Sequence, residues 1–246
     1  MALALVAGCD DPKAPVLPPH VNGTNTSPPK PQGEPVTLSR GALDDFRSEW
    51  AGFREGSWSE TRVTRQNPKG KETINSKVTV QKAEEAKVTL LRQAQGRAAR
   101  DETVKLSDDL RKLGTETIDV DGKAFECTIY ETTEVAGGET SRIKLWICKD
   151  APGRKVKMEQ TSIVRGVEMK GSGMLKRLGQ RVTVGKQQVS YAIFEMKGKT
   201  ALETNVSITR WISEQVPGFL VREEKRVSDG KEEILQVEEL VDFENK

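Results

Sequence analysis

The chain has 246 residues, enough for one large domain or two small ones. Its 39 Lys and Arg residues against 37 Asp and Glu leave a formal net charge of +2, so no surplus of positive charge is available for nucleic acid or an anionic bilayer. A hydrophobic content of 35% is low, but it is sufficient for a β-rich core.

The first nine residues are apolar and end in small side chains followed by Cys9. The segment Val6-Ala7-Gly8-Cys9 resembles the lipobox of bacterial lipoproteins, a family in which this cysteine receives a diacylglyceryl group and becomes the N-terminus after cleavage. The resemblance implies export and a lipid anchor on Cys9, with the protein facing the periplasm or the cell exterior. A secretory signal has about 15–30 residues, so we expect residues 1–9 to be a truncated signal; the alternative is a chance cysteine after a short apolar run.

A proline-rich segment follows this cysteine. Residues 10–38 hold eight of the eleven prolines, with Asn, Ser, Thr and Gly filling most of the remainder. Such a composition buries too little apolar surface to fold, so it predicts a disordered tether between the anchor and a single domain over 39–246. No later segment approaches the run of about 18 apolar residues that a transmembrane helix needs.

Several chemistries are excluded for the folded part. The single histidine, His20, lies in the tether, so catalysis by Ser-His-Asp or Cys-His groups and metal binding by imidazole are not expected after residue 38. The sequence also has no P-loop and no CxxC, GxGxxG or GxSxG motif. We therefore expect no enzyme activity, no catalytic residue, no metal and no cofactor.

The domain begins with a predicted helix over 39–55. Leu43, Phe46, Trp50 and Phe53 fall on one face of that helix, so it is amphipathic. A meander of three strands is predicted over 57–94, with its first turn at Asn67-Pro-Lys-Gly70.

An internal repeat occupies the rest of the chain. Trp146 recurs as Trp211, 65 residues later, and each Trp is followed six residues on by a Pro-Gly pair. Repeat one spans about 107–171 and repeat two about 172–242. The recurrence predicts a tandem duplication of one structural unit.

Each copy opens with the pattern Ser-x-x-Leu-x-x-Leu-Gly, at residues 107–114 and 172–179. Serine caps helices and glycine ends them, so we expect a short helical turn in each copy. Alternating apolar and polar residues then predict half-buried antiparallel strands. Arg165-Gly166 and Asp229-Gly230 are expected to turn the last hairpin of each copy.

These elements predict a mainly β fold of about twelve strands, as one curved antiparallel sheet or open barrel with the helix against its concave side. Over about 57–246 this order resembles the periplasmic lipoprotein-carrier and related lipoprotein-binding families, whose half-open barrels hold acyl chains. The tandem repeat departs from those families. The Trp-x5-Pro-Gly pattern is similar to that of a group of uncharacterised bacterial secreted proteins.

Two cysteines, Cys127 and Cys148, test the strand register. A two-residue turn at Gly137-Gly138 pairs them directly, at a non-hydrogen-bonded position that accepts a disulfide, and such a bond would form outside the cytosol. A three-residue loop instead aligns Phe125, Cys127 and Ile129 with a cleaner apolar face and separates the cysteines. A disulfide is therefore predicted only for the first register.

Aromatic and acidic residues allow a functional or a structural interpretation. Trp146 and Trp211 either anchor an apolar or sugar ligand or pack in the core. The helix-face residues either line a lipid groove or belong to the core: Phe46, Trp50 and Phe53. The repeated acids Glu131 and Glu195, and likewise Glu159 and Glu224, are either an acid–base couple or members of cross-strand ion pairs.

Two functions remain open. The first is an anchored, non-enzymatic module that binds a lipid or another apolar or amphipathic ligand in a β groove, which requires inward apolar positions left unfilled. The second is a structural module of the cell envelope with a filled core and a protein partner on an outer face. The membrane is a partner through Cys9 in both cases, and nucleic acid in neither.

Overall fold

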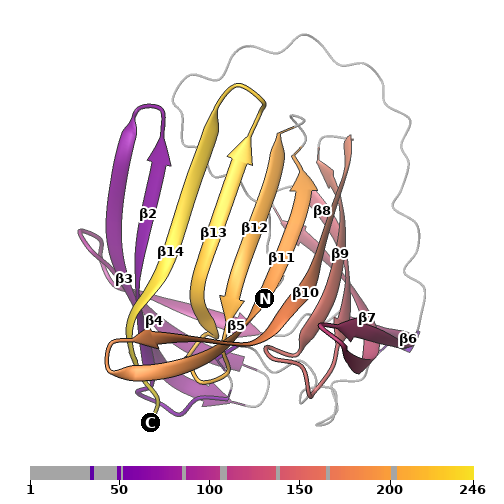
Figure 1. The fold of residues 1–246 in the computed structure, drawn as a ribbon, viewed down its shortest axis with the longest axis horizontal. Helices are drawn as coiled ribbons and strands as arrows, with labels where there is room; N and C mark the ends of the chain where they lie inside the picture. Colours follow the sequence, from indigo (N-terminus) through magenta and orange to yellow (C-terminus); the bar gives the residue numbers. More distant parts are fainter. Residues whose placement is uncertain are drawn as a thin grey trace.

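The structure is a computed structural model that describes residues 34–35, 49–50, 52–84, 87–105, 110–136, 139–164, 167–200 and 204–246. The signal segment, Cys9, nearly all of the predicted tether and residues 39–48 lie outside this part. The described strands form one sheet of fourteen antiparallel strands (Figure 1). In chain order they are β1 Glu34–Pro35, β2 Trp58–Asn67, β3 Gly70–Glu84, β4 Lys87–Ala94, β5 Arg100–Lys105, β6 Leu110–Val120, β7 Lys123–Ala136, β8 Glu139–Ile147, β9 Lys155–Val164, β10 Val167–Val184, β11 Gln187–Lys199, β12 Asn205–Ile212, β13 Leu220–Ser228 and β14 Glu233–Glu244.

The sheet is curved and open, which confirms the predicted fold class. Its strand order is β1-β6-β7-β8-β9-β10-β11-β12-β13-β14-β2-β3-β4-β5, so β5 and β1 are edges that do not pair with each other. All pairs of neighbouring strands are consecutive in sequence except β1 with β6 and β14 with β2. The last strand, β14, pairs with β2 and thereby joins the duplicated part to the meander.

The meander forms as expected. Asn67 pairs with Gly70 across a two-residue turn, and β2, β3 and β4 cover the predicted range 57–94. At the opposite edge, β1 lies inside the predicted tether and pairs with Lys112 and Arg111 of β6.

The described end of the predicted helix over 39–55 is not helical. Residues 49–50 and 52–55 form turns and bends, and Phe53 donates a backbone hydrogen bond to the carbonyl of Trp50. Trp50 and Phe53 nevertheless bury their rings, at 7% and 5% exposure, against Val80 and Leu90. The apolar spacing therefore reflects burial against the sheet, which turns achieve as well as a helix.

The short helical turns predicted at 107–114 and 172–179 are wrong over the described residues. Leu110 onward belongs to β6, and the whole second segment belongs to β10. Leu175 is fully buried opposite Phe194, while its neighbours point outward. Gly179, at φ +68°, serves a β-bulge and not a helix end, because the pairing of β10 with β11, and with β9 as far as Met174, outweighs an isolated turn's local preference.

These bulges bend two long hairpins over the outer face of the sheet. The first arm (residues 114–129) turns at Asp121-Gly122, and the second arm (residues 179–191) turns at Gly185-Lys186. The second arm lies across the front of β14 (Figure 1). At the turn of this arm, a Cβ built on Gly185 would lie 3.4 Å from the carboxylate of Asp242. The carboxylate of Asp121 accepts a hydrogen bond from the backbone N–H of Leu178 at 3.2 Å, so the turn of the first arm contacts β10 just before the second arm begins.

Candidate functional site

The two faces of the sheet differ in what they bury. Paired residues share a face, so the register follows each face from strand to strand. One face carries both arms. The other is the concave face, and the sequence of inward residues along β12 is Val206, Ile208 and Arg210.

The part of the concave face between β8 and β12 is apolar and nearly filled. Met158, Met196 and Ile208 are buried together with residues of β7 and β8. A hollow of about 20 Å³ remains, lined by these three side chains with Gly171 and Gly198, and this volume admits little more than one water molecule. The two facing glycines keep the backbones of β10 and β11 close, since a Cβ on Gly198 would meet the Cα of Gly171 at 3.2 Å.

A charged pocket of about 190 Å³ adjoins this hollow. Arg210 lies two residues after Ile208 on β12, a step of about 6.7 Å along the same face. The Nε of Arg210 donates to Glu223 at 2.5 Å, and Glu223 is 8% exposed. The lining also includes Arg92, which is ion-paired with Glu102 of β5.

A second carboxylate, Glu238 of β14, lies in the same pocket. The Thr61 hydroxyl donates to it at 2.8 Å. Burial raises the pKa of Glu238, and this effect outweighs the Thr61 hydrogen bond that lowers it; Glu223 adds a further rise. A carboxyl group whose charge is disfavoured and whose partner is a hydroxyl is suited to hydrogen bonding with a polar ligand.

The loop between β12 and β13 closes one side of the pocket. Gly218 has φ +80° and packs so tightly that a Cβ would lie 2.4 Å from the Trp50 indole. Its backbone N–H donates to the carbonyl of Glu49 at 3.1 Å. Nearby, burial lowers the pKa of Lys155, with Glu49 opposing that shift and Arg210 adding to it.

The aromatic residues named from the sequence do not form one groove. Phe46 and Cys9 lie outside the described residues. Trp50 lines the charged pocket, and the ring of Phe53 packs edge-on against Phe219 at 6.0 Å. Trp146 and Trp211 lie on the outer face, one beneath each arm.

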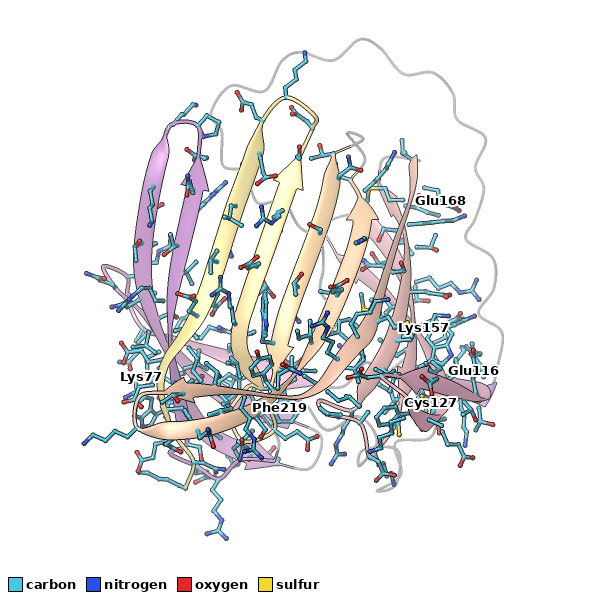
Figure 2. The ribbon with its side chains drawn as sticks, in the orientation of Figure 1. Lys77, Glu116, Cys127, Lys157, Glu168 and Phe219 are labelled. Carbon is cyan, nitrogen blue, oxygen red and sulfur yellow. The ribbon has the colours of Figure 1, made fainter. Side chains whose placement is uncertain are left out.

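The cysteines follow the register of the two-residue turn. Ala136 pairs with Glu139 and Thr128 with Ile147, so the next position places Cys127 opposite Cys148. The three-residue loop, favoured by the hydrophobic pattern, is wrong. Both cysteines are buried, free thiols in the structure, and the disulfide remains a prediction for the oxidised protein. Burial raises the pKa of Cys127 to about 11, with smaller rises from Cys148 and from Glu116 (Figure 2).

The repeated acids lie on the outer face and not in a catalytic pair. Glu131 is 2% exposed and its Oε2 lies 2.7 Å from the Nε of Arg142. Glu159 pairs with Lys157 at 2.8 Å, and Glu224 pairs with Arg222 at 2.5 Å. Within the described ranges no group of three or more His, Cys, Asp or Glu is placed to hold a metal ion. The described part also holds no helix with the length and apolar character needed to cross a membrane.

The charged pocket was not predicted from the sequence. Its lining comes from β2, β3, β4, β12, β13 and β14 and from residues 49–50 and 217–218, which are far apart in the chain. One signal was available: Arg210 continues the alternation Val206, Ile208 with a charge at the next inward position. A charge on an apolar stripe marks either the end of the buried part or a polar site. Which of the two is present depends on which strands lie beside β12 in the sheet.

Comparison with known proteins gives fold likeness only. No protein-family model matches the chain, and no curated protein sequence does. The hypothetical lipoprotein YmcC from Escherichia coli is 11% identical, with a TM-score of 0.31 over 83% of this chain and 89% of its own. A putative outer-membrane lipoprotein-sorting protein domain from Vibrio parahaemolyticus is 10% identical, with a TM-score of 0.38 over 84% and 89%.

A DUF1329 family protein from Desulfovibrio piger is similar at the same level. It is 10% identical, with a TM-score of 0.39 over 84% of this chain and 90% of its own. Likenesses this distant carry no argument about the function of this chain.

Proposed function

We propose that this protein is an exported, non-enzymatic lipoprotein of the bacterial envelope, held to a membrane through lipidated Cys9, and that its concave face binds an amphipathic ligand. The observation that carries the ligand proposal is the direct succession of an apolar hollow and a charged pocket along β12. Ile208 borders the first and Arg210 the second. The lipobox-like segment supports the anchor.

The two halves suit the two parts of such a ligand. The polar headgroup enters the charged pocket, where Arg92 and Arg210 offer donors and Glu223 and Glu238 offer acceptors. The apolar chain lies along Met158 and Met196. Methionine side chains are unbranched and adapt to different shapes, so they can move aside for a chain that the present hollow is too small to hold.

The size of the hollow favours a second candidate function. At about 20 Å³ the apolar part is close to filled, as expected for a structural or protein-interaction module of the cell envelope. In that case the charged pocket receives a polar group of a protein partner, and no small molecule accompanies the purified protein.

The test is the identity of the co-purified molecule. A Cys9→Ser variant of the full chain, exported into a bacterial periplasm behind a cleavable signal, is purified without detergent and extracted with organic solvent for mass spectrometry. A stoichiometric amphipathic species supports the proposal. A stable, ligand-free protein supports the interaction module.

A paired substitution locates the molecule. Arg210→Met with Glu223→Met removes both members of a buried ion pair, so neither charge is left without its partner. We expect this variant to lose the molecule. The control is Arg226→Met with Glu233→Met, an exposed pair at the β13–β14 turn with a separation of 3.1 Å. Equal ligand content in both variants would place the molecule elsewhere.

A further inference from the structure

A larger pocket lies on the outer face, beneath the second arm. Its volume is about 440 Å³, which falls in the range of about 300–1,000 Å³ found for small-molecule sites. The sheet supplies its floor and the arm supplies one wall. The residues that carry the argument are Val182, Tyr191, Trp211, Arg222, Glu224 and Glu239.

In the first copy of the repeat, the equivalent place around Trp146 is closed. Trp146 is only 4% exposed, and its indole N–H donates to Glu116 at 2.6 Å. Ile118 and Phe125 face each other across the first arm and are both buried. The ammonium of Lys157 lies 4.1 Å from the Trp146 ring centroid. The Trp146 ring is thus covered by protein side chains and almost closed to solvent.

The second arm lacks the side chains that close the first. By position relative to the arm's turn, Val182 replaces Ile118 and Val189 replaces Phe125. The exchange removes a phenyl ring and a methylene group. Val182 is consequently 37% exposed, whereas Ile118 is 8% exposed.

The loss of bulk leaves the second repeated Trp accessible. Gln180 stands where the first arm has Glu116. Trp211 is only partly buried, and its indole N–H has no hydrogen-bond partner among the described residues. The duplicated unit is thus closed over Trp146 and open over Trp211.

The charged groups beside Trp211 form ion pairs with one another but keep unused hydrogen-bonding capacity. Arg222 donates to Glu224 at 2.5 Å and to Glu239 at 2.6 Å. Its guanidinium carbon lies 5.3 Å from the Trp211 ring centroid. The Nε–H of Arg222 is buried and has no partner in the part of the chain that the structure describes. Each carboxylate keeps acceptor capacity, since it has about four lone-pair sites.

This arrangement discriminates between ligand charges. An anion would have to displace Glu224 and Glu239 from the guanidinium, which already holds two carboxylates. A neutral ligand with several hydroxyl groups displaces neither, because it donates to the free carboxylate lone pairs and accepts from the Trp211 indole N–H. An aromatic ring beside such groups also offers an apolar surface with a polar edge.

We propose that the outer pocket binds a neutral saccharide, with the apolar face of a pyranose ring against Trp211 and its hydroxyl groups on Glu224 and Glu239. A sugar ring combines an apolar C–H face with a rim of hydroxyls, and the pocket offers the complement of both. The inference is independent of the ligand proposed for the concave face.

The experiment uses the full chain carrying Cys9→Ser. Tri-N-acetylchitotriose and maltotriose are titrated separately, with saturation-transfer NMR and tryptophan fluorescence as readouts. We expect at least one trisaccharide to bind, and Trp211→Ala to weaken its binding by about tenfold or more. Trp58→Phe, which leaves the pocket intact, should retain both the affinity and the fluorescence change.

A filling variant provides a matched control. Val182→Phe fills the pocket from an exposed position and should weaken binding by about tenfold or more. Val167→Phe, at the other exposed valine of β10, should not weaken it. Glu239→Gln, at a largely exposed site, tests the hydrogen bonds should Val182→Phe fail to fold.

Three results would overturn the inference. The first is the absence of any saturation transfer at millimolar trisaccharide. The second is equal affinity in Val182→Phe and Val167→Phe. The third is tighter binding of an organic cation such as spermidine, abolished by Glu239→Gln, because this would identify a site for cations and not for neutral sugars.

Discussion

Removal of Arg142 should destabilise the fold far more than removal of its partner Glu131. The two form an ion pair of unequal exposure: the Glu131 side chain is 2% exposed and that of Arg142 is 35% exposed. Glu131 Oε1 has no hydrogen-bond partner among the described residues. In Arg142→Met the carboxylate therefore loses its ion pair with Arg142 in a place that is almost closed to water, and only the cross-strand neighbours Arg111 and Lys144 remain beside it as cations in β6 and β8.

The magnitude follows from that asymmetry. An uncompensated buried charge costs about 3–5 kcal/mol of unfolding free energy. In Glu131→Met the remaining guanidinium keeps its contact with solvent, and the expected loss is about 1 kcal/mol. The double variant replaces both charges with apolar side chains of similar length and should lie within about 1 kcal/mol of the parent. The coupling between the two positions is then at least about 3 kcal/mol.

Urea unfolding of the Cys9→Ser chain measures these free energies. For a domain of this size each kcal/mol corresponds to about 2–4 °C in Tm, so Arg142→Met should melt at least about 6 °C lower. Arg226→Met, which breaks an exposed pair with Glu233, should lose no more than about 1 kcal/mol. A loss in Arg142→Met as small as that in Arg226→Met would refute the reasoning, because it would mean that the remaining neighbours Arg111 and Lys144 compensate the buried carboxylate.

Three further predictions concern other sites. Burial raises the folded-state pKa of Glu238 above the ordinary value of 4.5, so between these two pKa values the folded state holds a proton that the unfolded state has released. Stability should therefore fall as pH rises from 4.5 through the raised pKa. Glu238→Gln should remove this slope in pH-dependent urea unfolding, and an unchanged slope would contradict the assignment. Because Cys127 is fully buried with a pKa of about 11, the reduced native protein should resist alkylation at pH 8, and thiol titration of unreduced, exported, denatured protein should find Cys127 and Cys148 joined; two free thiols would disprove the disulfide. Gly173→Ala should lose about 1–3 kcal/mol, because its Cβ would lie 2.6 Å from Met196 and Phe194, whereas Gly171→Ala, whose nearest contact is 3.5 Å from Lys197, should be near neutral; equal losses by urea unfolding would show that the strand backbone, and not the packing, sets the effect.

Predictions from local pattern succeeded wherever neighbouring residues decide the outcome. Period-two alternation and turn residues located β2, β3 and β4, since a strand with one buried face requires that alternation. The Gly137-Gly138 turn set the pairing of β7 with β8, because a two-residue turn leaves one register. The hydrophobic face failed as a guide to that register, since both faces of β7 and β8 are buried, one in the concave side and one beneath the first arm.

Predictions failed where distant segments compete for the same residues. The pattern Ser-x-x-Leu-x-x-Leu-Gly carries helix-cap signals, yet residues 172–174 pair with both β9 and β11, and Leu175 and Arg177 pair with β11. The turns and bends of residues 52–55 bury Phe53 against the sheet, as a helix would. In both cases tertiary burial outweighed a local preference worth about 1 kcal/mol.

By itself the sequence determined the mainly β character, the duplication and the exclusion of histidine chemistry after residue 38, because composition, period and repeat spacing are local properties. Only the tertiary structure decided which charges are buried together. Arg92, Arg210, Glu223 and Glu238 meet because β14 pairs with β2, a contact between the two ends of the folded part that no local signal specifies. The opening over Trp211 also depends on tertiary structure, since it arises from side chains missing on an arm that folds back across the sheet.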